Sequence, residues 1–475
     1  MLFSPIDGHA LGCVREADEA IANAAMSAAD AGFAAWSQTP HEERAAILER
    51  AAERLESHRG ELLALLQSEG GKTLDDALAE FREATDYCRY YAAQTRSALA
   101  EQPMPGPTGE SNMLRYCGRG VFVCISPWNF PLAIFLGQAT AALAAGNSVV
   151  AKPAEQTPLV AARVVALLHE AVVPVTALHF VPGGGKIGEI LVADPRVAGV
   201  AFTGSTVVGQ AINRALAAKN GPIVPLIAET GGINAMIVDA SALPEQVIDD
   251  AIASAFRTAG QRCSALRLLC LQDDVAARIL DMLIGAASEL KIGDPRDPAT
   301  HVGPVIDSDA REKLETWIAT QAQAGRVRFR YDLDPALPAR GLYVPPTIVE
   351  LESPGDLKEE VFGPILHVVR WRADELDALL DGIASNGTAL TLGIHSRIDL
   401  TVERIAARLQ SGNVYVNRNM IGAVVGTQPF GGAALSGTGP KAGGPNYLRR
   451  FATEQVVSVN TAAAGGNASL LAQDD

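Results

Sequence analysis

The sequence has few basic residues and no long apolar run. Lys and Arg together number 39 against 54 Asp and Glu, which gives a formal net charge of −15. This balance disfavours nucleic acid and anionic membranes as partners, because both bind basic patches. No apolar run approaches the roughly 18 residues that a membrane-spanning helix needs. We therefore expect a small-molecule substrate, no nucleic-acid partner and no membrane.

Cysteine is scarce, and its spacing fits neither a metal site nor a set of disulfides. The first residues, Met1 to Leu11, also lack the basic segment and apolar core of a secretory signal. We therefore predict no bound metal and a cytoplasmic location, where thiols stay reduced. The six cysteines are Cys13, Cys88, Cys117, Cys124, Cys263 and Cys270.

The chain is organised into a helical start and a long remainder. At 475 residues it is too long for one hydrophobic core and should divide into lobes. Residues from Glu16 to about Ala100 show helical periodicity, and Gln102 to Thr108 forms a Pro/Gly-rich break. Weak alternation from Met113 to Gly118 predicts the strand of a projecting hairpin.

From Gly120 onward, short apolar runs alternate with helical stretches. The first predicted strand is Val121–Ile125, and the alternation continues to a strand that ends at Ala228. A second alternating block runs from Ala235–Val238 to about Tyr415. This alternation predicts βαβ units and parallel sheets covered on both faces, which is the α/β class. Such sheets bind ligands at the carboxyl ends of their strands.

Cys263 is the one cysteine whose neighbours suggest chemistry. A thiolate attacks carbonyl carbon well, and the small residues Gly260 and Ser264 leave room for a substrate. Arg262 precedes the cysteine and would bias the thiol toward the thiolate. Taken alone, a cysteine in an apolar run is more often an inert core residue. The nucleophile hypothesis therefore depends on the rest of the chain.

Polar residues follow three of the predicted strands. Asn129 stands between two prolines, which suits an oxyanion-hole donor or a plain turn. Lys152 and Glu155 suit a pair that grips ribose hydroxyls or an exposed ion pair. Ser205 follows Phe202-Thr203-Gly204 at a predicted helix start, which suits pyrophosphate binding or helix capping.

Three further positions are marked by glycine. Gly183, Gly185 and Gly188 have the spacing of a dinucleotide fingerprint but lack the acidic residue expected about 20 positions later, so we interpret them as a turn beside a nucleotide. Glu229 ends a predicted strand before two glycines, which suits a general base or a solvated turn residue. The glycine-rich stretch 422–432 suits an anion-binding loop or a linker.

Taken together and in this order, these segments resemble the motifs of the aldehyde dehydrogenase superfamily. The resemblance spans essentially the whole chain; many members carry Lys after Gly232, whereas Ile233 stands here, at a position outside the chemistry. It implies a Rossmann-like NAD-binding lobe, an α/β catalytic lobe and a β-hairpin oligomerisation flap. The matching segments are Pro127–Pro131, Lys152–Glu155, Phe202–Ser205, Glu229–Gly232, Gly260–Cys263, Glu360–Pro364 and Pro429–Gly432.

The resemblance implies a thiol-based oxidation with NAD as the cofactor and no metal. It places Cys263 as nucleophile, Glu229 as general base and Asn129 as oxyanion-hole donor. Glu155 falls at the adenosine ribose, where it would favour NAD over NADP by repelling a 2′-phosphate, and Glu360 falls at the nicotinamide ribose. The expected cofactor residues are Ser126, Pro127, Trp128, Lys152, Ala154, Glu155, Gly185, Phe202, Thr203, Gly204, Ser205, Glu360 and Phe362.

A narrower resemblance concerns the substrate. Residues 230–239, 262–267 and 439–445, with the tail at 465–471, look like the glutamate semialdehyde dehydrogenase module of bifunctional proline utilization A. This implies oxidation of L-glutamate γ-semialdehyde, the open form of 1-pyrroline-5-carboxylate, to L-glutamate in proline catabolism. Ser264, Gly422 and Ala423 would hold the α-carboxylate. The expected substrate residues are Phe130, Arg262, Ser264, Gly422, Ala423 and Phe430.

The same resemblance implies a domain plan. The NAD-binding domain would comprise 1–100 and 119–230, the catalytic domain 231–435, the flap 101–118 and 446–462, and the tail 463–475. The flap implies a homodimer or a larger oligomer. A proline-oxidising flavin domain does not fit into 475 residues that the dehydrogenase already fills. A C-terminal module excised from behind an upstream proline dehydrogenase domain and a stand-alone relative both remain open.

Three other functions compete with this interpretation. A cysteine acyltransferase or hydrolase needs a histidine partner, and none of the eight histidines lies in a comparable motif. A non-catalytic relative would be free to lose Cys263 or Glu229, and both are present. Within the enzyme class, a dehydrogenase for another semialdehyde, such as succinate semialdehyde, is the alternative.

Overall fold

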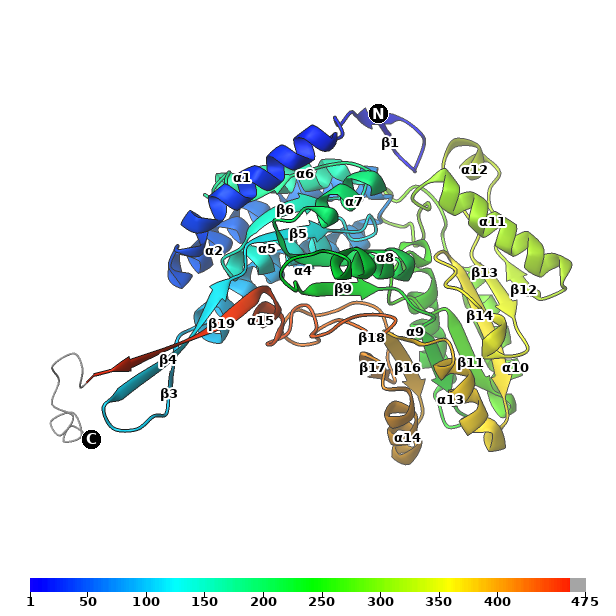
Figure 1. Ribbon diagram of the computed structural model, residues 1–475. Coiled ribbons are helices and arrows are strands. Elements are labelled where there is room, and N and C mark those ends of the chain that lie inside the picture. Colours follow the sequence, from blue (N-terminus) through cyan, green and yellow to red (C-terminus); the bar gives the residue numbers. More distant parts are fainter. Residues whose placement is uncertain (462–475) are drawn as a thin grey trace.

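The computed structural model describes residues 1–461, and the tail predicted at 463–475 lies outside them. Figure 1 shows two bodies, each built around its own sheet, and a thin hairpin that projects from one of them. Helices and strands alternate along both sheets. The fold is therefore mixed α/β, as the sequence pattern predicts.

The first sheet has five parallel strands in the order β7-β6-β5-β8-β9. Its central strand is the apolar run from Val121 to Ile125, and both of its faces are covered. Phe122 and Cys124 face one core cluster, whereas Val121 and Val123 face another. The strands are β5 (Val121–Ile125), β6 (Ser148–Lys152), β7 (Leu178–Phe180), β8 (Val197–Gly204) and β9 (Leu226–Thr230).

Eight helices cover this sheet. One face packs on α2 (His41–Ser57), α3 (Arg59–Gly70), α4 (Leu74–Ala98), α5 (Ala133–Ala144) and α6 (Pro158–Glu170). The other face packs on α1 (Glu19–Ser37), α7 (Gly185–Ala193) and α8 (Thr206–Ala217). The helices of the N-terminal quarter of the chain thus lie on both faces of the first sheet, α1 on one and α2, α3 and α4 on the other.

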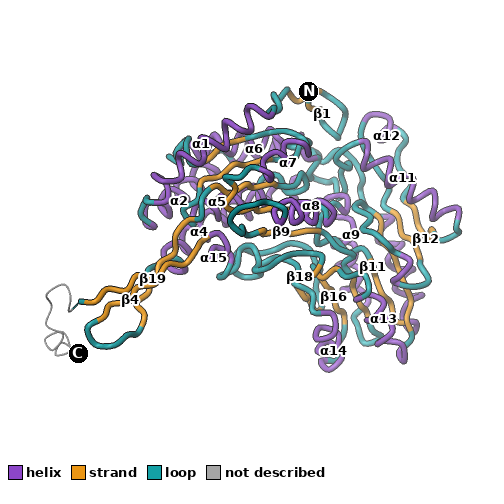
Figure 2. Tube along the Cα trace, in the orientation of Figure 1, coloured by secondary structure: helices purple, strands orange, loops and turns teal. Residues whose placement is uncertain are grey.

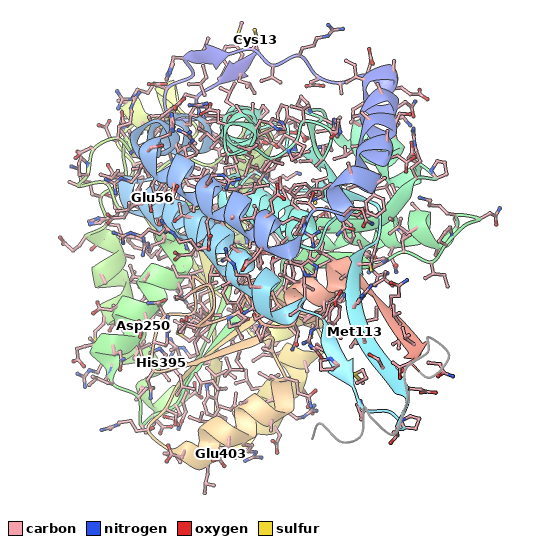
Figure 3. The ribbon with its side chains drawn as sticks, turned by 90° about the vertical axis from the view of Figure 1, so that its left-hand side faces the viewer. Cys13, Glu56, Met113, Asp250, His395 and Glu403 are labelled. Carbon is pink, nitrogen blue, oxygen red and sulfur yellow. The ribbon has the colours of Figure 1, made fainter. Side chains whose placement is uncertain are left out.

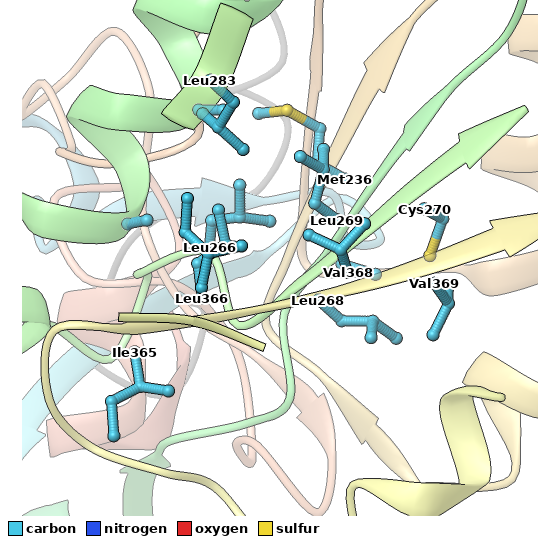
Figure 4. Packing of buried hydrophobic residues seen from close by; sticks show 14 of the residues in the cluster. Met236, Leu266, Leu268, Leu269, Cys270, Leu283, Ile365, Leu366, Val368 and Val369 are labelled. Atoms are coloured by element: carbon cyan, nitrogen blue, oxygen red, sulfur yellow. The ribbon is translucent and has the colours of Figure 1, made fainter. Parts of the chain in front are cut away.

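The second sheet has seven strands in the order β12-β13-β14-β11-β10-β16-β17, all parallel except β12. Figure 4 shows its core, in which Met236, Leu269 and Val368 from three neighbouring strands pack together. The strands are β10 (Ala235–Val238), β11 (Leu268–Gln272), β12 (Val327–Arg330), β13 (Thr347–Glu350), β14 (Ile365–Trp371), β16 (Thr391–His395) and β17 (Asn413–Val416). The accompanying helices are α9 (Pro244–Phe256), α10 (Asp273–Ser288), α11 (Ser308–Gln323), α12 (Ala336–Arg340), α13 (Leu376–Ala384) and α14 (Asp399–Leu409).

The projecting hairpin is a three-stranded antiparallel sheet, coloured as strands in Figure 2. It comprises β3 (Gln102–Met104), β4 (Glu110–Gly118) and β19 (Ala452–Asn460). In Figure 3, where the hairpin points toward the viewer, Met113 marks its position. Met104, Val456 and Val459 on this sheet are 45%, 60% and 46% exposed.

The remaining elements are short. They are β1 (Leu2–Phe3) with β2 (Ala10–Gly12), β15 (Thr388–Ala389) with β18 (Ala433–Ala434), the helix α15 (Tyr447–Phe451) and three 3₁₀ turns at Arg257–Gly260, Pro354–Asp356 and Ala373–Glu375. Within residues 1–461, no helix combines the length and apolarity needed to cross a membrane. The same residues contain no cluster of side chains suited to a metal ion.

Candidate active site

The backbone just before Cys263 is strained. Thr258, Ala259 and Gly260 have positive φ angles of 56°, 52° and 66°. A β-branched residue such as Thr258 is rare in this region, and backbone strain of this kind is common at functional sites. Gly260 is required where it stands, because a Cβ there would lie 2.1 Å from the carbonyl oxygen of Gly363. The turn thus brings the cysteine loop against the Gly363 segment.

Side chains from other segments hold the carbonyl groups of this loop. Asn129 Nδ2 donates to the carbonyl of Gln261 at 3.1 Å, and Asn234 Nδ2 donates to that of Cys263 at 2.6 Å. Arg267 donates to two further loop carbonyls. An amide group carries two N–H donors, so Asn129 keeps one for a ligand. The structure therefore places Asn129, which the sequence singled out, directly against the cysteine loop.

Cys263 is surrounded by more negative than positive charge. Burial raises the pKa of its thiol to about 12, and the carboxylates of Glu360, Glu229 and Glu83 act in the same direction. Arg267 is the nearby cation that lowers this pKa. The thiol is therefore protonated near neutral pH.

Arg262 does not act on the thiol as the sequence suggested. Its Nη2 donates to Asp76 at 2.8 Å and its Nε to Thr258 Oγ1 at 2.9 Å. Burial raises the pKa of Asp76, but Arg262 and Arg257 outweigh it and bring the pKa to about 2. The charge of Arg262 is thus neutralised by Asp76. Its remaining link to the expected substrate residues is the ring of Phe130, 5.3 Å from the guanidinium carbon.

Glu229 lies at the end of β9 with one oxygen held and one unpaired. Its Oε2 accepts a hydrogen bond from the amide of Gly432 at 2.8 Å, whereas its buried Oε1 has no partner within residues 1–461. Burial raises the pKa of Glu229 to about 8, against the lowering effects of Gly432 and Lys441. The glycine-rich stretch that the sequence suggested as an anion-binding loop therefore uses the amide of Gly432 to hold a carboxyl group of the chain itself.

The expected ribose and pyrophosphate residues lie at neighbouring strand ends, because β6, β5 and β8 are adjacent. Lys152 ends β6 and is 4% exposed; its Nζ donates to the carbonyl of Pro153 at 3.0 Å. Burial lowers the pKa of Lys152, and Glu155, which is exposed, raises it. Ser205 Oγ accepts from the amide of Val208 at 3.4 Å, so the predicted cap of α8 is present.

The other expected cofactor residues border the same edge. The Ser126 amide donates to the carbonyl of Lys152 at 3.1 Å, and the rings of Trp128 and Phe362 meet edge to face with centroids 5.6 Å apart. Gly185 begins α7, which packs against α8. The remaining members, Pro127, Ala154, Phe202, Thr203 and Gly204, lie at the ends of β5, β6 and β8 or directly after them.

Glu360 connects this edge to the cysteine loop. Its Oε1 accepts from Arg267 Nη2 at 3.0 Å and Nε at 3.3 Å. Burial raises the pKa of Glu360, whereas Arg267 and the amide of Gly232 lower it. The expected nicotinamide-ribose residue is thus attached to the same guanidinium that holds the loop of Cys263.

The expected substrate residues are less closely joined. Tyr415 Oη donates to the carbonyl of Gly422 at 3.2 Å. Burial raises the pKa of Tyr415, and Cys263 raises it further. Tyr415 therefore connects Gly422 to the surroundings of the cysteine. Ala423 is the next residue along the chain, and Ser264 follows the cysteine directly. Phe430 and Ala442 pair through two backbone hydrogen bonds. Among residues 1–461, no backbone hydrogen bond joins Phe430 to Cys263.

Comparisons with known proteins agree with this geometry. A family model described as "Aldehyde dehydrogenase family" matches residues 1–457. The chain belongs to the aldehyde dehydrogenase family. The bifunctional protein PutA of Klebsiella aerogenes is 52% identical over 449 residues, which cover 93% of this chain and 33% of that protein. The 1-pyrroline-5-carboxylate dehydrogenase of Geobacillus kaustophilus is 38% identical over 444 residues, covering 92% of this chain and 85% of that enzyme.

Solved aldehyde dehydrogenase structures have the same fold. A variant of proline utilization A from Bradyrhizobium japonicum superposes with a TM-score of 0.93 at 64% identity, covering 95% of this chain and 46% of that one. A 1-pyrroline-5-carboxylate dehydrogenase from Thermus with bound NAD has a TM-score of 0.91 at 34% identity, covering 97% and 89%. The chain spans about one third of the length of the curated bifunctional relatives, at 33% of each.

Four residues of this aldehyde dehydrogenase site were missed by sequence reasoning. Arg267 was detectable as a charge inside an apolar run, and Glu83 as an acidic residue on the buried face of α4, three positions after Glu80. Asn234 and Tyr415 gave no local signal, because their contacts are with segments distant in sequence.

Proposed function

We propose that this chain catalyses the NAD-dependent oxidation of L-glutamate γ-semialdehyde, formed when 1-pyrroline-5-carboxylate opens in water, to L-glutamate. The observation that carries the proposal is the loop of Cys263, whose carbonyls are fixed by Asn129, Asn234 and Arg267. The proposed general base, Glu229, is buried, and its Oε1 has no hydrogen-bond partner within residues 1–461. The similarity to 1-pyrroline-5-carboxylate dehydrogenases supports the choice of substrate.

The first sheet is suited to NAD. Lys152 is a buried ammonium with one carbonyl partner, which leaves donors for ribose hydroxyls, and Glu155 stands exposed nearby as an acceptor. Val207 and Val208 at the start of α8 are 74% and 46% exposed, a surface that an adenine ring would cover. When bound, NAD supplies the hydride acceptor. The proposed pyrophosphate site is the N-terminus of α8, capped by Ser205.

The chemistry begins at Cys263. Its thiol loses its proton to solvent and the sulfur attacks the aldehyde carbon; two N–H groups stabilise the oxyanion, the remaining Asn129 donor and the amide of Cys263. No residue within 1–461 accepts a hydrogen bond from that amide. Oxidation leaves a thioester on Cys263. Glu229 then takes a proton from water, which attacks the thioester, and glutamate departs.

The substrate's far end is proposed to face Ser264, Gly422 and Ala423, whose hydroxyl and amide groups suit the α-carboxylate. Phe130, Arg262 and Phe430 complete the proposed substrate site. Glu83 acts to raise the pKa of Cys263, while burial and Glu80 raise the pKa of Glu83 itself to about 7. When ionised, Glu83 would attract a substrate's ammonium group, which succinate semialdehyde lacks.

The proposal extends to organisation and location. We assign residues 1–100 and 119–230 to an NAD-binding domain, 231–435 to a catalytic domain, and the hairpin of β3, β4 and β19 to an oligomerisation flap that supports a homodimer or larger assembly. In bifunctional relatives the corresponding region is one part of a longer protein, which supports an upstream proline dehydrogenase domain. All six cysteines are free, which favours a cytoplasmic location.

The test is NADH formation with 1-pyrroline-5-carboxylate and succinate semialdehyde in parallel assays. We expect a clear preference for 1-pyrroline-5-carboxylate, and NAD should be used in preference to NADP. Preference for succinate semialdehyde would leave the roles of Cys263 and Glu229 intact but overturn the substrate. Absence of NADH with both would overturn the proposed function.

A further inference from the structure

Arg267 is a fully buried arginine between the cysteine loop and the proposed nicotinamide-ribose residue. Its backbone is fixed on both sides: its amide donates to the carbonyl of Asn234 at 3.0 Å, and its carbonyl accepts from the backbone amide of His367 at 2.9 Å and from His367 Nδ1 at 3.0 Å. These contacts anchor it between β10 and β14, just before β11. The guanidinium therefore extends from a rigid part of the second sheet.

One half of the guanidinium binds the cysteine loop. Nη1 donates to the carbonyl of Gly260 at 2.7 Å, and Nη2 donates to that of Arg262 at 3.0 Å. These carbonyls flank the residue whose own carbonyl Asn129 holds. Arg267 thus fixes the strained loop on both sides of the proposed oxyanion-hole contact.

The other half binds the cofactor side. Nη2 and Nε donate to Glu360 at 3.0 and 3.3 Å, and the guanidinium lies 5.0 Å from the centre of the Phe362 ring. Nη1 also reaches the carbonyl of Gly363 at 3.4 Å. Both proposed nicotinamide-side residues therefore contact one planar group.

We infer that Arg267 is a positioning residue that sets the distance between the nucleophile Cys263 and the nicotinamide-ribose contact Glu360. This rests on the proposed function. Transfer of a hydride requires the hemithioacetal carbon and the cofactor ring to be in contact, and the two loops that carry them share no other bridging cation among residues 1–461. Only the fork of an arginine offers donors in both directions at once; a lysine keeps the charge but not the geometry.

The experiment compares Arg267→Lys and Arg267→Met with a matched control, Arg44→Lys. Arg44 is also buried and donates to carbonyls, those of Ala144 and Thr39, but it lies in α2 and touches nothing in the site. Four quantities are measured: kcat and KM with 1-pyrroline-5-carboxylate, the NAD dissociation constant by titration, the pH dependence of Cys263 alkylation by iodoacetamide, and the melting temperature. The exposed Cys13, followed in the same digests by mass spectrometry, is the internal reference thiol.

We expect Arg267→Lys to lower kcat roughly 100-fold with little change in the KM for 1-pyrroline-5-carboxylate, because the reacting groups are misplaced. NAD should bind about tenfold more weakly, because Glu360 loses its charged donor. Alkylation of Cys263 should keep its pH dependence in Arg267→Lys and move to higher pH in Arg267→Met. Arg44→Lys should lose stability without these changes.

The inference is overturned if Arg267→Lys keeps kcat within about threefold, or if Arg44→Lys lowers kcat equally. Should the Arg267 variants not fold, Gly231→Ala is the second test: its Cβ would lie 2.0 Å from Glu360 Oε2, so it displaces Glu360 from an intact Arg267. Weaker NAD binding supports the inference, and unchanged NAD binding contradicts it; because Glu360 raises the pKa of Cys263, its displacement should also move alkylation of Cys263 to lower pH. Alkylation and NAD titration need no aldehyde, so they test Arg267 even if the substrate assignment fails.

Discussion

Cys263 and Glu229 are both held in the protonated state at neutral pH. Burial raises their pKa values to about 12 and about 8, because neither charged form is well solvated there. In the proposed reaction, the positive charge of bound NAD⁺ would favour the thiolate of Cys263 before hydride transfer.

Replacing Glu229 separates the two halves of the reaction. Glu229→Gln should lower kcat by at least roughly 100-fold, because deacylation loses its general base. Thioester formation does not use that base, so rapid mixing with NAD and 1-pyrroline-5-carboxylate should still give a burst of about one NADH per active site. A variant that is equally slow in the first turnover would show that Glu229 acts before the thioester forms.

The limits of sequence reasoning are clearest at these residues. Cys263, Glu229 and Asn129 could be singled out from the sequence, because each stands in a local pattern at a loop or strand end. The ion pair of Arg262 with Asp76 was not, because it joins residues 186 positions apart. The local sequence suggested that Arg262 acts on its neighbour, whereas packing satisfies its charge with a partner from another element.

At the scale of elements, the strands and helices of both sheets follow from periodicity, but helix ends do not. Neither α5 nor α6 has a side-chain cap of its own. Instead, Glu80 of α4 accepts from the amides of Leu132 and Ala133, and Glu69 of α3 accepts from those of Leu159 and Val160. A cap supplied from a distant helix leaves no local sequence signal.

The buried Glu69 carboxyl group makes the stability of the protein depend on pH. Burial raises its pKa to about 7, against the lowering effect of its two amide donors. The folded state therefore binds the proton more tightly than the unfolded chain, whose value is near 4.5. The stability from this group is present below about pH 4.5 and is lost as the pH rises through 7, an effect on the order of 3 kcal/mol.

Glu69→Gln cannot lose a proton, so its melting temperature relative to the unaltered protein should rise by a few degrees between pH 4.5 and 7.5. Differential scanning fluorimetry across that pH range measures the difference in melting temperature between the two proteins. The other carboxyl groups are the same in both, so their effects cancel in this difference. Glu61→Gln is the control, because Glu61 lies on the same helix but forms an exposed ion pair with Arg163. A constant difference for Glu69→Gln across the range would contradict the raised pKa.

At the scale of the molecule, the two lobes meet through the cysteine loop. Asp76 of α4, in the layer on the first sheet, accepts hydrogen bonds from Arg257, Thr258 and Arg262 of the second lobe. Gln67 of α3 also donates across to the carbonyl of Pro295 at 2.9 Å. Cys263 therefore lies in the loop where the lobes are joined, between the first sheet and the second.

The contacts between the lobes give no role to the flap, the projecting hairpin of β3, β4 and β19. Val456 and Val459 are 60% and 46% exposed and belong to none of the core clusters of residues 1–461, and an apolar surface of this kind is typical of an interface between subunits. Because β19 is held to β4 by backbone pairing from Ala452 to Asn460, a side-chain change at Val456 should leave the hairpin folded.

Val456→Asp should therefore shift the protein from a dimer or larger oligomer toward the 49.8 kDa monomer, because burying an unpaired charge in an interface costs several kcal/mol. Sedimentation velocity over a range of protein concentrations measures the shift. Val175→Asp is the control: this valine is 68% exposed between α6 and β7, outside the hairpin, and its change should leave the oligomer intact. If Val456→Asp sediments as the unaltered protein does, the flap does not hold the subunits together.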